Sequence, residues 1–180
     1  MVKAEIIVFG MLSGCIQATS SPEVTESSSP GPCERLEDTN NDGVIESRTT
    51  YAYNDTSQLL EEDRDTNNDG VVDTRITHTY RDDGSPLTVE TDVGADGIVD
   101  IRVTYLYDAL GVLTAMETDT NGDGVADERV TYEYDEALAR LTELYDRNAD
   151  GVIDAQVITR CVGPKTPKRS LIEKCLGIGS

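Results

Sequence analysis

An internal repeat of 27 residues constrains the fold of this chain more than any other feature of its sequence. An Asp-Gly pair recurs in five copies without any change of spacing, at Asp42-Gly43, Asp69-Gly70, Asp96-Gly97, Asp123-Gly124 and Asp150-Gly151. Another aspartate stands four residues before each of these aspartates, and a further acid stands four residues after it. A fixed period of this kind is typical of an array of small structural units, each packed against the next. We expect residues 36–161 to form one repeat domain.

The segments between the acidic loops alternate with a period of two, which is typical of β-strands. In the strand expected at residues 129–134, Val130, Tyr132 and Tyr134 share one face and polar side chains share the other. A turn and a second, shorter strand follow in each copy, at residues 59–63, 87–91, 113–117 and 141–145. The equivalent residues of two other copies, also expected on the buried side, are Ile76, His78, Tyr80, Val103, Tyr105 and Tyr107.

These strands predict an all-β fold, an antiparallel meander of five hairpin repeats with about ten strands. Because one apolar face has to pack against something, we expect the sheet either to close into a barrel or to stay open and curl. The chain begins with the second strand of a hairpin, at Cys33, and ends with the first strand of one, at Cys161. Pairing of these two half-units favours closure and a Cys33–Cys161 disulfide, whereas a Cys161–Cys175 bridge is the alternative.

Each acidic loop carries oxygen ligands at positions 1, 3, 5 and 9 and a glycine at position 6, except that the third loop has Gly94 at position 3. Calcium takes about six to eight oxygen ligands, and the backbone carbonyl of position 7 commonly supplies one of them. The predicted calcium ligands are Asp38, Asn40, Asp42, Val44, Glu46, Asp65, Asn67, Asp69, Val71, Asp73, Asp92, Asp96, Ile98, Asp100, Asp119, Asn121, Asp123, Val125, Asp127, Asp146, Asn148, Asp150, Val152 and Asp154.

The Asp-x-Asn-x-Asp-Gly pattern resembles the calcium loops of EF-hands, dockerins and thrombospondin type-3 repeats. It departs from the EF-hand at position 12, where the bidentate Glu is replaced by Thr49, Ile76, Val103, Val130 or Val157. The missing Glu implies weak structural sites with dissociation constants of about 10⁻⁴–10⁻³ M, weakest in the third loop. The alternative is that Asn, Asp and Gly merely form tight turns, which leaves the acids at positions 1 and 9 unexplained.

The N-terminal segment is typical of a bacterial lipoprotein signal peptide that covers residues 1–15. Residues 6–12 are a short apolar stretch, and Leu12-Ser13-Gly14-Cys15 resembles a lipobox, in which the cysteine is acylated. The alternative for this stretch is a buried apolar strand. Residues 16–35 form a Ser/Pro-rich tether, and residues 162–180 form a basic C-terminal tail. This arrangement predicts attachment to a lipid bilayer through Cys15 in the bacterial cell envelope, at the outer membrane.

The hairpin turns carry a second resemblance. Tyr107-Asp108-x-x-Gly111-x-Leu113-Thr114 resembles the YD (RHS-type) repeat of bacterial surface and toxin-shell proteins, and Tyr134-Asp135 with Leu141-Thr142 matches part of it. The resemblance implies β-hairpin repeats in a curling sheet and a role at the cell surface. It transfers no catalytic residue.

Charge and residue usage narrow the function classes. The chain has 15 basic and 35 acidic side chains, which argues against a nucleic-acid partner. The one histidine, His78, stands on the expected buried face where other copies have Tyr, so we expect it to be a packing residue and not a catalyst. We therefore expect a non-enzymatic protein. The Arg row at Arg48, Arg75, Arg102 and Arg129 is expected on a solvated face, paired with neighbouring acids. The sequence therefore predicts a calcium-binding, lipid-anchored envelope protein with a structural or interaction role and an unknown protein or glycan partner. An adhesin-like or carbohydrate-binding module is the first alternative, and an enzyme accessory subunit the second.

Overall fold

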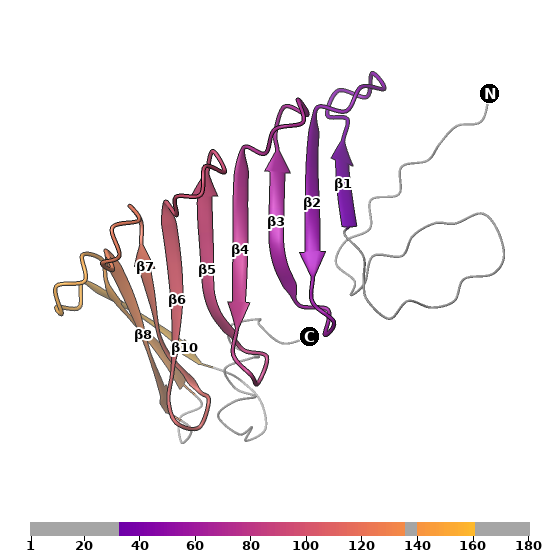
Figure 1. The fold of residues 1–180 in the computed structure, drawn as a ribbon. Helices are drawn as coiled ribbons and strands as arrows, with labels where there is room; N and C mark the ends of the chain where they lie inside the picture. The colour runs from indigo at the N-terminus through magenta and orange to yellow at the C-terminus, as the bar shows by residue number, and fades with distance from the viewer. Residues whose placement is uncertain (1–32, 136–139, 161–180) are drawn as a thin grey trace. The chain divides into compact units, whose positions relative to one another are not determined.

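The computed structural model describes residues 33–135 and 140–160 (Figure 1). These residues form ten β-strands and no helix: β1 (Cys33–Glu37), β2 (Ser47–Tyr53), β3 (Leu59–Asp65), β4 (Thr74–Tyr80), β5 (Pro86–Val93), β6 (Ile101–Tyr107), β7 (Leu113–Asp119), β8 (Glu128–Asp135), β9 (Arg140–Asp146) and β10 (Ala155–Arg160). Within the same residues, no helical segment has the length and apolarity needed to cross a membrane. The predicted signal peptide with Cys15, the basic tail and residues 16–32 of the predicted tether lie outside the described residues.

The ten strands form one antiparallel sheet whose strand order is the order of the chain, from β1 to β10. This confirms the all-β meander and its repeated hairpins. Because β1 and β10 end the strand order, the sheet is open, which matches the predicted alternative and makes the closed barrel wrong. Curvature strong enough for closure is usually introduced by glycine kinks and bulges within strands. None of the ten strands contains a glycine, and the register shifts of β2–β3, β4–β5 and β6–β7 lie beside the hairpin turns.

The predicted Cys33–Cys161 disulfide belonged to the closed arrangement. Cys33 is buried at the start of β1 and takes part in a disulfide. Cys161 and Cys175 lie outside the described residues, so the choice between the two predicted bridges stays a prediction. The strand that carries Cys33 begins within the segment predicted as tether, so the ordered sheet starts ahead of residue 36.

The hairpin turns differ in length, and β-bulges compensate for the difference. In the β6–β7 hairpin, Leu106 pairs with Ala115 and Tyr107 pairs with Leu113, so that Thr114 is an extra residue on β7. Equivalent shifts occur in the β2–β3 and β4–β5 hairpins. In β8–β9 the turn is one residue longer and the pairing runs on without a shift. The bulges therefore hold the strand bodies of all four hairpins in the same register.

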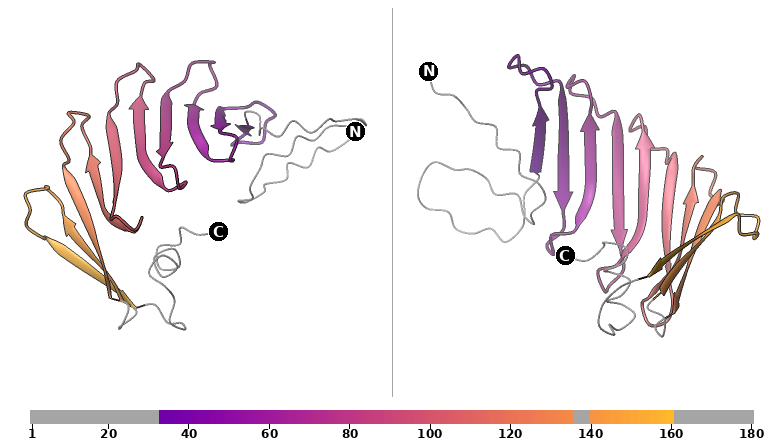
Figure 2. Two further views of the ribbon diagram at one scale, coloured as in Figure 1. Left: turned by 60° about the horizontal axis from the view of Figure 1, so that its bottom comes forward. Right: turned by 180° about the vertical axis from the view of Figure 1, so that it is seen from behind.

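Two compact units make up the chain, Met1–Val72 and Asp73–Ser180. In the second unit, tyrosines at the ends of strands tie each hairpin to the one before it. The Tyr107 hydroxyl donates a hydrogen bond to the Pro86 carbonyl (2.7 Å), and the Tyr134 hydroxyl donates one to the Leu113 carbonyl (3.0 Å). Views from other sides show how the strands of this unit turn progressively, as expected from the right-handed twist of β-strands (Figure 2).

The predicted burial of one sheet face is wrong for the described residues. His78, Tyr80 and Tyr105 are only half-buried, because no second layer of described residues covers them. Buried apolar side chains come from both faces and are few: Cys33, Val112, Leu113, Ala115 and Leu141. In a single layer, a side chain is shielded mainly by its lateral neighbours in the same sheet. The alternating pattern identified the two faces correctly but overestimated how deeply either one is buried.

Candidate metal sites

The first residue of each acidic loop is held at the end of a strand. The second strands of the hairpins extend beyond the predicted ends, so that Asp65, Asp119 and Asp146 are the last residues of β3, β7 and β9. Each of these three residues is buried, with 6%, 6% and 4% of its surface exposed. A buried carboxylate needs hydrogen-bond donors, because leaving it without them costs several kcal/mol. The loop supplies these donors from its own backbone.

The fourth loop shows the arrangement most fully. Asp119 accepts hydrogen bonds from the backbone amides of Asn121 (3.2 Å), Gly122 (2.8 Å) and Gly124 (2.8 Å). Burial raises the pKa of Asp119, but these backbone hydrogen bonds together outweigh burial and lower its pKa below the usual aspartate value. Asp119 is therefore ionised at neutral pH. A carboxylate with two or three backbone donors is pre-set to remain charged with or without a cation.

Positions 5 and 9 also bond to backbone amides within their own loops. In the first loop, Asp42 accepts a hydrogen bond from the amide of Val44 (2.8 Å), and Glu46 accepts one from the amide of Thr39 (2.7 Å). The position-9 acids of the third, fourth and fifth loops make the same bond, at 2.7 to 2.8 Å. The acids at positions 1 and 9 thus have a role that requires no metal. This gives the plain-turn alternative a physical basis that the sequence pattern alone did not show.

The backbone of every loop is left-handed at positions 4 and 6, and that of the third loop also at Gly94. Glycine stands at position 6 in all five loops with φ between 86° and 89°, which confirms the expected sharp turn. Position 4 is also left-handed and is occupied by Asn41, Asn68, Ala95, Gly122 and Ala149. An alanine in this region costs about 1–2 kcal/mol, so the third and fifth loops are strained at this point. The asparagines of the first two loops and Gly122 of the fourth are the sequence signals for this second turn.

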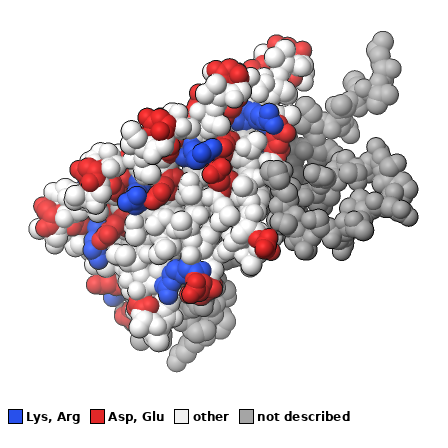
Figure 3. Space-filling view, in the orientation of Figure 1, with Lys and Arg blue, Asp and Glu red and all other residues white. Residues whose placement is uncertain are grey.

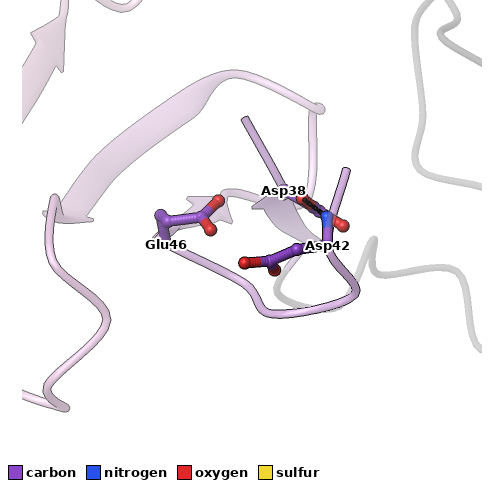
Figure 4. Close-up of side chains that lie close together, drawn as sticks. All are labelled: Asp38, Asp42 and Glu46. Atoms are coloured by element: carbon purple, nitrogen blue, oxygen red, sulfur yellow. Dashed lines mark hydrogen bonds between the residues drawn. The ribbon is translucent and has the colours of Figure 1, made fainter. Parts of the chain in front are cut away.

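Three carboxylates converge in the first loop (Figure 4). Asp38, Asp42 and Glu46 each place one oxygen within 4.8 Å of the other two, and among the described residues no other loop forms such a group. The difference lies at position 9, where the first loop has Glu and the others have Asp, a side chain shorter by one methylene. The Asn40 side-chain amide lies beside the group and donates a hydrogen bond to Glu46 (3.0 Å). Carboxylate and carbonyl oxygens of this kind are the ligands that calcium prefers.

Neighbouring loops touch each other within each unit, which the sequence analysis did not anticipate. The Asn68 side-chain amide of the second loop donates a hydrogen bond to the Ile45 carbonyl of the first (3.0 Å). In the second unit, a Cβ added to Gly122 of the fourth loop would lie 2.0 Å from the Val99 carbonyl of the third. The residue at position 4 is the point of contact in both cases. A small residue or an asparagine at this position is the one signal that could have revealed the contact.

Three members of the Arg row lie beside acids on one face of the sheet, as predicted for the row. Ion pairs join Arg48 to Glu34 (2.6 Å), Arg102 to Glu90 (2.8 Å) and Arg129 to Glu117 (2.6 Å). Figure 3 shows basic patches bordered by acidic atoms on this face, and further acidic atoms at the loop tips. A polar cavity of about 120 Å³ opens between β6, β7 and the fourth loop, a volume below the ~300–1,000 Å³ of ordinary ligand pockets. It is lined by Arg102, Thr104, Glu117, Asp119, Gly124 and Ala126.

Comparisons with known proteins show similarity to solved structures only. No protein-family model matches the chain, and no curated protein matches it. A crystal structure of a DUF3836 family protein from Parabacteroides distasonis is similar to part of the chain, with 16% sequence identity and a TM-score of 0.34. The similarity covers 56% of this chain and 98% of that one. The resemblances to YD repeats and to calcium loops therefore stay predictions.

Proposed function

We propose that this chain is a non-enzymatic β-repeat protein whose acidic loops bind calcium as a structural ion. The observation that carries the proposal is the convergence of Asp38, Asp42 and Glu46 in the first loop. Three carboxylates this close repel one another unless a cation or a proton offsets their charge. Calcium is the cation that suits an all-oxygen site on a flexible loop. The sites serve the fold, since every copy of the repeat carries one.

The five loops are expected to differ in affinity. In the first loop Glu46 reaches the other carboxylates directly, so it has the most complete set of charged ligands. In the second, fourth and fifth loops the shorter position-9 aspartate would act through a bridging water, as position 9 often does in calcium loops. The third loop has Gly94 in place of a position-3 ligand and is expected to bind most weakly. Without the EF-hand Glu, all five sites fall in the weak class, about 10⁻⁴–10⁻³ M.

The proposal also places the protein in the bacterial envelope, attached to a lipid bilayer through Cys15, with an unidentified protein or glycan partner. This part is supported by the lipobox-like Leu12-Ser13-Gly14-Cys15 and by the Ser/Pro-rich tether that follows it. Expression in a bacterial host with labelled palmitate tests it. We expect label in the membrane fraction for the parent chain and none for Cys15→Ser. Equal labelling of the two would remove the anchor from the proposal and leave the calcium sites unaffected.

Thermal unfolding with and without calcium tests the metal sites. A site with a dissociation constant of about 1 mM contributes about 1.4 kcal/mol at about 10 mM calcium. We therefore expect the melting temperature to rise by several degrees between EGTA and this calcium concentration, and to rise less with magnesium, which needs stricter octahedral geometry. Sodium chloride at matched ionic strength controls for screening of the net charge of -20. A melting temperature that responds only to ionic strength would refute calcium binding.

A pair of variants assigns the effect to the first loop. Glu46→Gln removes one of the three converging charges but keeps an oxygen that can accept the Thr39 amide. Glu128→Gln makes the same change of charge at an exposed residue at the start of β8. We expect the first variant to lose part of the calcium-dependent shift and the second to keep all of it. Equal shifts in the two variants would exclude the first loop as a calcium site.

A further inference from the structure

The two ends of the open sheet are complementary halves of one hairpin. β10 is the first strand of a hairpin, because it follows an acidic loop, and β1 is the second strand of one, because it precedes an acidic loop. Among the described residues β10 pairs only with β9, and β1 pairs only with β2. The outer edge of each strand therefore offers backbone hydrogen-bonding groups for one more strand. We propose that β10 of one molecule pairs with β1 of a second copy of this chain.

The repeat fixes the register of this pairing. In the β8–β9 hairpin, Arg129 lies opposite Asp146, Thr131 opposite Leu144, and Glu133 opposite Thr142. The β8 residue of each pair has its equivalent on β10 one 27-residue repeat later, and the β9 residue has its equivalent at β1 four repeats earlier. These two shifts convert the three pairs into pairs between β10 of one molecule and the β1 segment of the second copy. The resulting partners are Gln156 with Asp38, Ile158 with Leu36, and Arg160 with Glu34.

Two of these pairs are chemically matched. Ile158 and Leu36 are large apolar side chains that are 48% and 51% exposed, and each would cover the other. Arg160 would lie opposite Glu34, and these two side chains have opposite charges. Of the three pairs, this one lies farthest from the acidic loops. Glu34 already pairs with Arg48 of its own molecule (2.6 Å), and its two carboxylate oxygens can accept both guanidinium groups. Opposite charges directly across an antiparallel pair stabilise it, and like charges destabilise it.

The pairing is head to tail, because the edge used by one molecule differs from the edge used by its partner. A contact of this type repeats without closing unless the rotation between copies happens to form a ring. Within the described residues, each added molecule again presents the outer edge of β10 and the outer edge of β1, so the sheet extends from one molecule to the next. The net charge of -20 opposes such growth at low ionic strength, so assembly is expected to increase with added salt.

Sedimentation velocity of the full chain tests the proposal. Concentrations up to about 1 mM are used so that an interface with a dissociation constant in this range would be detected. We expect mass to increase in steps of one chain, in EGTA as well as in calcium, so the result does not depend on the metal sites. A chain that remains monomeric at every concentration and salt level overturns the proposal, since residues 161–180 or another partner would then cover the β10 edge.

Charge-reversal variants make the register itself testable. Arg160→Glu places two acids in the junction, and Glu34→Arg places two arginines there, so each variant alone should weaken assembly by about tenfold. A mixture of the two variants restores an opposite-charge pair at every junction and should assemble like the parent chain. Glu133→Arg, the same reversal at an exposed residue of the interior strand β8, should leave assembly unchanged.

Circular dichroism of each variant establishes that it is folded before its assembly is compared. Arg160→Glu keeps the Glu34–Arg48 ion pair intact, so this variant remains informative if Glu34→Arg loosens β1. Assembly of the mixture no stronger than that of the separate variants would refute the Arg160–Glu34 register and with it the proposed junction.

Discussion

Asp119→Asn separates the stability that the acidic loops derive from their own hydrogen bonds from any stability that a metal adds. One carboxylate oxygen of Asp119 accepts the amides of Asn121 and Gly122, and the other accepts the amide of Gly124 at 2.8 Å. An asparagine keeps one of these oxygens and presents an NH₂ group in place of the other. The Gly124 amide then faces a donor, and the two remaining bonds lose their charge.

The size of the effect follows from these contacts. A hydrogen bond to a charged group contributes about 1.5–3 kcal/mol, and a neutral one contributes about 0.5–1.5 kcal/mol. Loss of one charged bond and weakening of two others is therefore expected to cost about 2–4 kcal/mol. Asp119 is buried, with only 6% of the residue exposed. For a domain of this size, each kcal/mol lowers the melting temperature by roughly 3–5 °C. We expect a drop of about 6–20 °C in EGTA.

Glu128→Gln is the matched control for this measurement. It removes the same charge from an exposed residue at the other end of the same loop and should change stability by less than about 0.5 kcal/mol. Similar melting temperatures for the two variants in EGTA would show that the carboxylate–amide bonds do not hold the loop.

The pH dependence of the same variant has a defined sign. Folding lowers the pKa of Asp119 below its ordinary value of 3.8, so the unfolded chain takes up a proton before the folded chain does. The stabilisation by Asp119 is therefore complete above about pH 5 and is lost as the pH falls through the lowered pKa of the folded state. The gap in stability between the parent chain and Asp119→Asn should narrow on acidification, and a gap that widens would contradict this account.

Two further predictions concern the packing of the loops and the tyrosine face. Gly122→Ala should destabilise the fold far more than Gly124→Ala in thermal melts, because both glycines have positive φ but only Gly122 would press a Cβ against the Val99 carbonyl. Burial, with a smaller effect of Glu143, raises the pKa of Tyr132 to about 12. The stability that Tyr132 contributes should therefore be present below about pH 10 and lost toward pH 12, and Tyr132→Phe should reduce this alkaline loss.

The periodicity of the sequence was sufficient to predict the hairpins and their connections. A period of two indicates β-strands independently of the tertiary fold, and the Asp-Gly pairs cannot lie within strands. The order of strands, loops and turns follows from these two signals. The five glycines at position 6 confirm the loop conformation. What the pattern could not show was where a strand ends. Asp65, Asp119 and Asp146 resemble loop residues in sequence, yet their strand hydrogen bonding continues because the loop amides satisfy their carboxylates.

Closure of the sheet illustrates a different limit of prediction from sequence. The half-hairpins at the two ends are complementary, which is a statement about local pairing. Whether they meet depends on curvature summed over every strand, and curvature is set by bulges and glycine kinks that lie outside the repeat pattern. Bulges in this chain occur beside the turns at Tyr53, Tyr80 and Tyr107, where they correct the register of short turns. The complementarity was correctly identified, but it does not join the ends of one molecule.

The hydrogen bonds within the first loop also bear on how tightly it can hold a cation. Glu46 accepts the Thr39 amide through one oxygen and the Asn40 side-chain amide through the other, at 3.0 Å. Asn40 in turn directs its carbonyl oxygen to the amide of Asp42 (2.8 Å). A calcium ion bound between these side chains would have to replace the Asn40–Glu46 bond, at a cost of about 1.5–3 kcal/mol. A loop that satisfies its own carboxylates is stable before the ion arrives and gains less from it, and this favours weak, structural binding over the tight binding of a sensor.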